Sequence, residues 1–296
     1  MPIVIEQTEA FMREHGAEMA DEGFDNPYIG VSYFLVMRLI STEVADRYFK
    51  IASGKMDATD ARRLVSLGET LYELRNTPGI VEFCNRLRDK SPDHAFYNEV
   101  IATRMFLDVG FRVRAIEERR RKGESFDFSI KKEGRTICVE VTGIGIPSLS
   151  AKTLRNTLKA ERKQLPKNRP NVIVVEIPEA WMDQPDAKTV LAEEAFRLFN
   201  SSGRVNHVVY LCDQHNDVEL NGEWYSMYQL RMIDVANPRP RNQTDELQFL
   251  TVLRGSDLSK DRDILAMPDQ ASVHRAVRAD RPFYRWIDGF IGRSAE

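Results

Sequence analysis

The sequence of 296 residues is long enough to bury a sizeable core, and its 42% hydrophobic and 29% charged content is typical of a soluble globular protein. No stretch approaches the roughly 20 apolar residues of a membrane span. The first residues lack the basic and apolar regions of a signal peptide. The three cysteines lie too far apart for a disulfide framework or a CxxC zinc site. These features predict no membrane partner and favour the cytoplasm.

Positive charge is concentrated in one part of the chain. The net charge is −3, but residues 111–170 carry sixteen Lys and Arg against seven Asp and Glu, an excess of +9 that leaves −12 for the remainder. Phosphate contacts dominate nucleic-acid affinity, and a local basic patch is their usual footprint. The alternative is a solvated face whose counter-charges lie elsewhere on the fold.

Residues 1–90 are predicted to form a helical N-terminal region. Helices are expected over residues 6–19, over the apolar run 29–50, after Thr59 as an N-cap, and over residues 80–87. No motif in this region carries chemistry. A helical bundle that binds a protein partner or forms a homodimer is the interpretation left open.

The next helix, residues 94–109, carries an acid beside its apolar side. Asp93 is a suitable N-cap and Gly110 a suitable C-terminal stop. Glu99 lies in the second turn among large apolar residues, where a carboxylate needs a partner or a metal. The alternative is a surface glutamate one step away from the apolar side. A strand at residues 111–116 follows.

Residues 126–142 predict a β-hairpin with acids on one of its sides. Apolar and polar residues alternate along both halves, and successive side chains of a strand point to opposite faces. The apolar set therefore enters one layer and leaves Asp127 and Glu140 in polar positions of adjacent strands. Gly134 supplies the positive φ that the turn needs.

Asp127 and Glu140 would then share a site. Two carboxylates within a few ångströms repel each other, so one pKa rises unless a cation lies between them. Mg²⁺ suits such a pair, because it usually takes one or two carboxylates together with substrate phosphate. The alternative is an ordinary amphipathic hairpin with acids on its wet face.

Basic segments flank the hairpin on both sides. The loop before it contains a run of four cations, placed to hold a phosphate backbone beside Asp127: Arg119, Arg120, Arg121 and Lys122. The helix after it, residues 150–165, has five cations within an arc of roughly 100° beside its apolar stripe: Lys152, Arg155, Lys159, Arg162 and Lys163. This helix has a single acid, which lies outside the arc and can pair with few of the cations. The arc therefore predicts a surface that faces a bound anion.

The rest of the chain alternates strands and helices. Strands are expected at residues 172–177, 207–212 and 224–235, with helices at 186–199 and 245–254. An aromatic tail at residues 283–290 is expected to pack on the body, since exposed aromatic rings would be a liability.

The order of elements over residues 94–178 is a helix with Glu99, three strands with Asp127 and Glu140, a basic helix and a buried strand. This order resembles the PD-(D/E)XK nuclease superfamily, also called the restriction-endonuclease-like fold. The resemblance implies an α/β protein with a three-layer α-β-α core and a mixed sheet. That core would span residues 91–254, after a helical region at 1–90 and before a C-terminal tail at 255–296.

In that superfamily an acid of the first helix, an aspartate opening the second strand and a glutamate of the third strand bind Mg²⁺. By resemblance these are Glu99, Asp127 and Glu140, and Mn²⁺ is an alternative cofactor. The usual proline before the aspartate is Phe126 in this sequence, a departure that costs little.

The superfamily's lysine, two residues after the glutamate, is replaced by Thr142. That lysine positions the attacking water and steadies the charge developing on phosphate. Some members supply the cation from the following helix instead. Lys159 is the first candidate here, and Lys163 and Lys152 are the others.

The function implied is a Mg²⁺-dependent endonuclease that hydrolyses phosphodiester bonds of DNA, with RNA as an alternative substrate, in restriction, phage defence or repair. Arg119–Lys122, Lys152, Arg155 and Lys163 would hold the nucleic-acid backbone. The alternative, favoured by Thr142, is a catalytically inactive nuclease-like subunit that binds nucleic acid or has a structural or sensing role in a larger complex. Walker, GxGxxG and HExxH motifs do not occur, so nucleotide and zinc-protease chemistry are unsupported.

Overall fold

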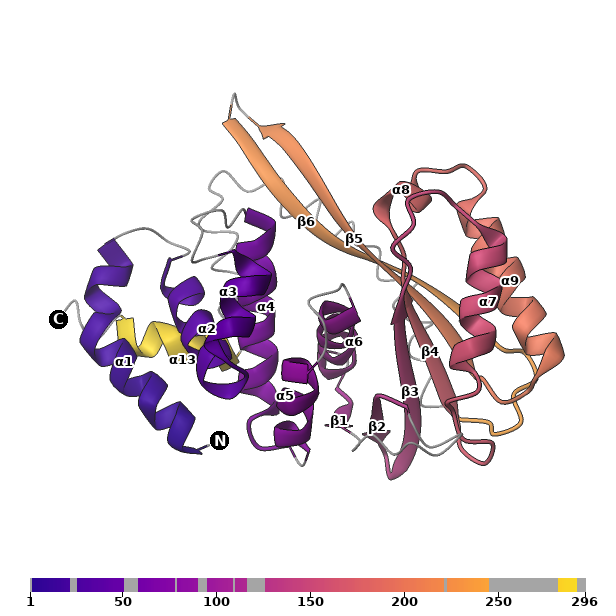
Figure 1. Ribbon diagram of the computed structural model, residues 1–296, viewed down its shortest axis with the longest axis horizontal. Coiled ribbons are helices and arrows are strands. Elements are labelled where there is room, and N and C mark those ends of the chain that lie inside the picture. Colours follow the sequence, from indigo (N-terminus) through magenta and orange to yellow (C-terminus); the bar gives the residue numbers. More distant parts are fainter. Residues whose placement is uncertain are drawn as a thin grey trace. The chain divides into compact units, whose positions relative to one another are not determined.

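The computed structural model describes residues 2–21, 26–50, 58–77, 79–89, 95–108, 110–115, 126–220, 223–244 and 282–291. The chain divides into two compact units (Figure 1). One combines Met1–Pro92 with Ser256–Glu296, and the other is Asp93–Gly255. The first is helical, and the second contains the sheet.

The helical unit contains six helices within its described residues: α1 (Pro2–Asp21), α2 (Asn26–Leu39), α3 (Thr42–Phe49), α4 (Ala58–Leu74), α5 (Ile80–Asp89) and α13 (Pro282–Ile291). The apolar run expected to continue through residues 29–50 is interrupted at Ser41. The Ser41 side chain caps α3 by accepting a hydrogen bond of 3.1 Å from the Val44 N–H. Helix α4 begins at Ala58, one residue before the expected cap Thr59.

The C-terminal helix α13 completes the core of this unit. Phe283, Tyr284 and Ile287 are buried in one cluster with residues of α1, α2 and α4. The Tyr28 hydroxyl donates a hydrogen bond of 2.7 Å to Asp288, and the Trp286 ring stacks on Tyr72 at 4.5 Å between centroids. The aromatic tail is therefore packed rather than exposed.

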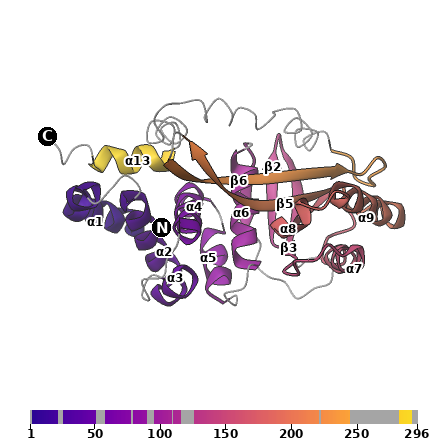
Figure 2. The same ribbon diagram turned by 90° about the horizontal axis from the view of Figure 1, so that it is seen from above.

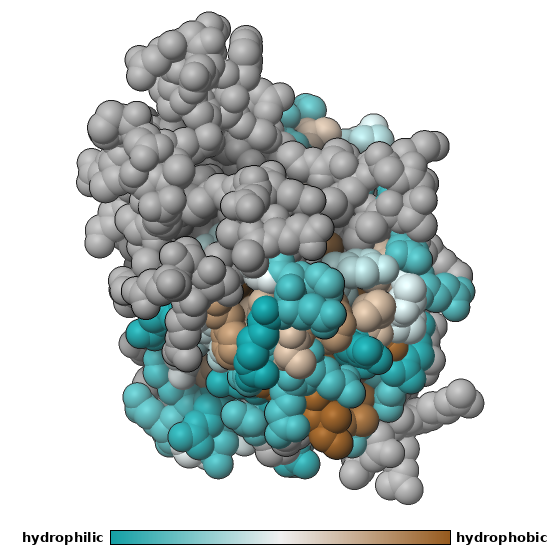
Figure 3. All heavy atoms as spheres, turned by 90° about the vertical axis from the view of Figure 1, so that its left-hand side faces the viewer, coloured by the Kyte–Doolittle hydropathy of each residue, from teal (hydrophilic) through white to brown (hydrophobic). Residues whose placement is uncertain are grey.

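Hydrophilic residues cover most of the coloured surface in the view of Figure 3, with a hydrophobic area near its lower edge and paler hydrophobic atoms between the hydrophilic ones. Ile3 and Val81 are the exposed large hydrophobic side chains of the helical unit. No described helix is both long enough and apolar enough to span a membrane.

The second unit is an α/β domain built on one six-stranded sheet. Its elements are α6 (Ala95–Asp108), β1 (Arg112–Ala115), β2 (Phe128–Lys132), β3 (Arg135–Gly143), α7 (Ala151–Glu161), β4 (Asn171–Glu176), α8 (Glu179–Met182), α9 (Ala187–Ser201), β5 (His207–Leu220) and β6 (Glu223–Ala236). The strand order is β1-β2-β3-β4-β5-β6. Pairing is parallel between β3 and β4 and between β4 and β5, and antiparallel elsewhere. The predicted α/β class with a mixed sheet is confirmed.

Helices cover both faces of this sheet, which gives three layers (Figure 2). On one face α6 packs on β1 and β3, where the Phe106 and Phe128 rings meet edge to face at 6.0 Å. On the other face α7 and α9 cover a cluster that includes Leu154, Leu158 and Ile173. The central strand β4 is buried on both faces, as its continuous apolar run predicts.

The turn between β2 and β3 fixes the register of the hairpin. Glu133 and Gly134 have φ values of 49° and 88°, and Lys132 pairs with Arg135 across the turn. A two-residue turn with positive φ at both positions matches the twist of the flanking strands. The expectation of a positive φ at Gly134 is confirmed.

Three expectations lie outside the described residues. They are the Asp93 cap of α6, the basic loop Arg119–Lys122 and the helix at residues 245–254.

Candidate active site

Asp127 immediately precedes β2, and Glu140 lies on the adjacent strand β3. The pairing of β2 with β3 ends at Phe128 opposite Val139. The Oδ2 atom of Asp127 accepts a hydrogen bond of 2.8 Å from the backbone N–H of Val141. This hydrogen bond places the Asp127 side chain beside the backbone that follows Glu140 on β3. The Glu140 side chain itself points to one face of the sheet.

That face is the one covered by α7 and α9. Glu140 alternates with Val139 and shares its side of β3 with Cys138, and it lies opposite Ile173 of β4. Both Cys138 and Ile173 belong to the cluster beneath α7 and α9. Glu140 is only 4% exposed, whereas Asp127 is half-buried. A buried carboxylate requires a compensating charge or hydrogen bonds.

Glu99 lies in a different layer. It is 1% exposed on α6, and α6 packs on the face of the sheet opposite to α7. Within the described residues, which include Glu99, Asp127 and Glu140, no group of three or more His, Cys, Asp or Glu side chains could hold a metal ion. The structure thus places Asp127 against the strand that carries Glu140, and within the described residues it does not assemble the three predicted acids into one metal group.

A second polar group, which the sequence did not predict, lies at the carboxyl ends of β3 and β4. A Cβ atom on Gly143 would lie 2.3 Å from Asn98 Nδ2 and 3.2 Å from Glu176 Oε2. Gly143 therefore leaves room for the Asn98 amide from α6. The Nδ2 atom of Asn98 is buried and makes no hydrogen bond within the described part of the chain. Ligands of open α/β sheets bind beyond the carboxyl ends of strands.

The signal for this second group in the sequence is weak. Asn98 precedes Glu99 on the same helix, and Glu176 is the single charged residue of a buried apolar strand. A charged residue at the end of an otherwise apolar, buried strand indicates that this end of the strand faces a polar site. The approach of α6 to Gly143 is a contact between distant segments, so sequence spacing alone did not reveal it.

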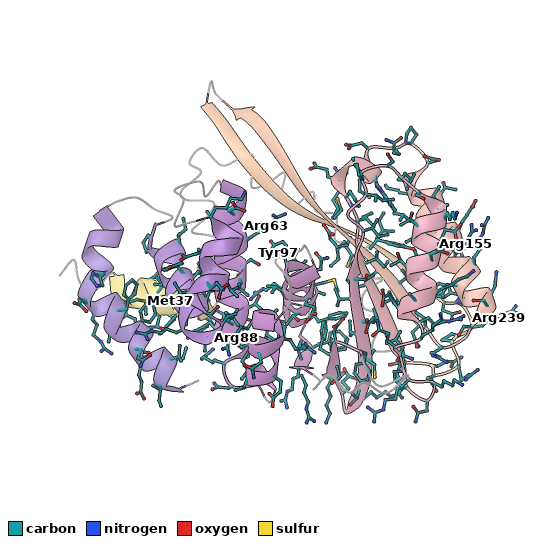
Figure 4. All side chains as sticks on the ribbon, in the orientation of Figure 1. Met37, Arg63, Arg88, Tyr97, Arg155 and Arg239 are labelled. Carbon is teal, nitrogen blue, oxygen red and sulfur yellow. The ribbon has the colours of Figure 1, made fainter. Side chains whose placement is uncertain are left out.

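Two arginines from the basic side of α7 contact α9, and Figure 4 labels one of them, Arg155. Arg155 donates hydrogen bonds of 2.8 Å from Nε and 2.7 Å from Nη2 to the two carboxylate oxygens of Glu194 on α9. Arg162 donates one of 3.1 Å to the Ser201 hydroxyl. Arg155, predicted to bind a nucleic-acid backbone, is thus engaged within the domain.

Glu194 has a lowered pKa because Arg155 hydrogen-bonds its carboxylate, while burial acts in the opposite direction. The charges of Arg155, Arg197 and Lys159 lower this pKa further. Lys159, the first candidate for a catalytic lysine, therefore lies close enough to Glu194 to act on it electrostatically. This location links Lys159 to the α7–α9 contact.

The remaining predicted residues stand apart from this contact. Lys152 and Lys163 are exposed on and just after α7, and Thr142 is half-buried on β3, two residues beyond Glu140. The predicted loop Arg119–Lys122 lies outside the described residues.

The structure defines the protein as a three-layer α/β domain with a mixed sheet, joined to a separate helical unit. Comparison with known proteins found no matching family model, no matching curated protein and no matching solved structure. Membership of the nuclease superfamily therefore stays a prediction.

Proposed function

We propose that this protein is a metal-dependent nuclease that hydrolyses phosphodiester bonds of DNA. The observation that carries the proposal is the hydrogen bond from the Val141 N–H to Asp127, which holds this carboxylate beside the strand that carries Glu140. Two carboxylates on adjacent strands form a donor set that suits Mg²⁺ or Mn²⁺, since hard cations prefer oxygen ligands. The order of α6, β1, β2, β3, α7 and β4 supports the resemblance to PD-(D/E)XK nucleases.

In this proposal Asp127 and Glu140 hold the metal ion, and the hydrogen bond from Val141 orients the Asp127 carboxylate. A bound divalent ion lowers the pKa of a coordinated water and polarises the phosphoryl oxygen. Glu140 is buried, so water is kept from its carboxylate and its charge acts strongly on a bound cation. Glu99 lies in the α6 layer and is not assigned as a direct ligand in this proposal.

The alternative is a nuclease-like subunit that binds nucleic acid without cutting it. Thr142 stands where a catalytic lysine is expected, and the proposed substitute Lys159 acts on Glu194 beside α9. Both observations favour this alternative. In either function DNA is the proposed partner, with RNA as the other nucleic acid.

We also place the protein in a reducing compartment, the cytoplasm. Cys84, Cys138 and Cys212, all within the described residues, are buried and form no disulfide with one another. Reduced buried cysteines are usual in such a compartment.

The test is a cleavage assay on supercoiled plasmid and on linear duplex DNA with Mg²⁺ or Mn²⁺. Wild-type protein should cut, and Asp127→Asn and Glu140→Gln should reduce the rate by at least about 100-fold. Glu193→Gln, which removes an exposed acid from α9, is the matched control and should cut like the wild type. Added EDTA should stop cleavage by every active variant.

Equal cutting by wild type, Asp127→Asn and Glu140→Gln would remove the proposal, because the activity would not depend on these acids. DNA binding by a wild type that never cuts would support the non-catalytic alternative.

A further inference from the structure

Three loops at one end of the sheet carry positive charge and contain no acid. They are residues 162–170 between α7 and β4, residues 202–206 between α9 and β5, and residues 237–244 after β6. Together they hold seven cations, which we call the basic edge: Arg162, Lys163, Lys167, Arg169, Arg204, Arg239 and Arg241. Glu161, which precedes the first loop, accepts a hydrogen bond of 2.7 Å from Gln164.

Hydrogen bonds join these loops into one surface. Asn242 Nδ2 donates to the backbone oxygens of Lys167 and Arg169, at 3.2 and 2.9 Å. The Arg241 N–H donates to the Gly203 oxygen at 2.7 Å, and Asn206 Nδ2 donates to the Asn242 oxygen at 2.6 Å. The loop backbones that carry the cations are therefore joined before any ligand arrives, which lowers the entropy cost of binding.

Acids of the described residues do not neutralise the charges of the basic edge. None of its seven cations forms an ion pair with an acid in the described part of the chain. The Arg204 guanidinium donates hydrogen bonds to the backbone oxygens of Arg162 and Leu165, at 2.9 and 3.1 Å. Burial lowers the pKa of Arg204, and the like charges of Arg162 and Arg241 lower it further. A bound anion would relieve this repulsion.

The composition of the edge identifies the kind of anion. Five of its seven cations are arginines, whose planar guanidinium groups match phosphate geometry in two-point hydrogen bonds. Lys163, Lys167, Arg169, Arg239 and Arg241 are exposed. No exposed large hydrophobic side chain lies in the three loops, so the surface lacks the anchors of a peptide groove or of membrane insertion.

We propose that the basic edge binds the phosphate backbone of a nucleic acid, through Arg239, Arg241 and Lys167 together with their neighbours. Figure 4 shows Arg239 at the end of this domain away from the far tip of the β5–β6 hairpin. The surface reads no bases, since its cations are suited to backbone phosphates rather than to base edges. The inference deepens the proposed function by giving the nucleic acid a surface, but it does not require cleavage.

The experiment measures binding of fluorescein-labelled duplex DNA and single-stranded RNA by anisotropy, in EDTA, at several salt concentrations between about 50 and 200 mM. Arg239→Gln/Arg241→Gln removes two exposed side-chain charges and keeps the backbone hydrogen bonds at both positions. Lys131→Gln/Lys188→Gln removes the same charge from exposed positions on β2 and α9 and is the matched control.

We expect the arginine variant to bind at least about fivefold more weakly, with a salt dependence reduced by about two units of slope. The lysine control should bind like the wild type. Stronger binding of DNA than RNA, or the reverse, identifies which nucleic acid is the source of the phosphates.

Equal weakening in both double variants would overturn the inference, because net charge rather than the basic edge would then govern binding. A wild type that binds neither nucleic acid, or that prefers polyglutamate or anionic vesicles, would overturn it as well. Retained binding by a protein that never cleaves DNA would remove only the proposed nuclease activity.

Discussion

Arg155 of α7 and Glu194 of α9 form a two-point ion pair, in which two guanidinium nitrogens lie 2.8 and 2.7 Å from the two carboxylate oxygens. Glu194 is buried, while Arg155 keeps about a third of its side chain exposed. The pair joins the two helices that cover the face of the sheet carrying Glu140. The stability of this ion pair therefore affects the packing of α7 and α9, the helical layer over the candidate site.

Glu194→Gln should lower the free energy of unfolding at neutral pH by about 1 kcal/mol, a value reduced by the exposure of Arg155. The lowered pKa of Glu194 means that the ionised carboxylate is favoured in the folded state. This stabilisation is present above the ordinary glutamate value of 4.5 and is lost as pH falls through the lower folded value. Urea unfolding followed by circular dichroism should show the difference between variants closing below about pH 4.

Glu193→Gln is the control for that experiment. Glu193 is exposed and lies 3.9 Å from Arg197, so its loss should change the unfolding free energy by less than about 0.5 kcal/mol. A Glu194→Gln effect that is the same at neutral and acid pH would contradict the ion-pair account.

Gly143→Ala should destabilise the α/β domain by about 1–3 kcal/mol, because the new methyl group would meet the Asn98 amide at 2.3 Å. The same substitution in an Asn98→Ala background should cost less than about 0.5 kcal/mol, since the obstructing amide is gone. Urea unfolding of the four proteins gives the coupling energy. Additive effects of the two substitutions would show that Asn98 does not fill the space beside Gly143.

The cysteine thiols of the native protein should react slowly with a thiol reagent. Burial raises the pKa of Cys138 to about 11 and that of Cys84 to about 12, so little thiolate forms near neutral pH. In native buffer at about pH 8 less than about a tenth of these thiols should react within minutes, and all three cysteines should react in urea.

Ser148→Cys places a thiol at an exposed position and provides the positive control for reagent and buffer. Labelled peptides identified by mass spectrometry assign each reaction. Rapid native labelling of Cys138 would be inconsistent with its burial beneath α7 and α9.

The sequence predicted the core strands and the hairpin because their side-chain pattern is local. The run expected at residues 172–177 is β4 at Asn171–Glu176, and a short turn with Gly134 sets the register that pairs Phe128 with Val139. Period-two alternation and the turn were sufficient to predict this hairpin.

The sequence pattern did not predict the contacts between segments that are distant in the chain. Strand β5 was expected at residues 207–212 but continues to Leu220, because pairing with β6 satisfies its backbone where the apolar pattern has ended. Helix periodicity predicted the arc of cations on α7. It did not predict that Glu194 faces Arg155, because the two residues lie 39 positions apart in the sequence. The meeting of Asn98, Gly143 and Glu176 depends in the same way on packing between distant segments.

Binding of Mn²⁺ tests most directly whether Asp127 and Glu140 act together. Isothermal titration calorimetry should detect one site in the wild type and in Glu193→Gln. Asp127→Asn and Glu140→Gln should each weaken that site by at least about tenfold, since each removes a charged oxygen ligand. Binding that is unchanged in both of these variants would contradict a shared metal site on β2 and β3.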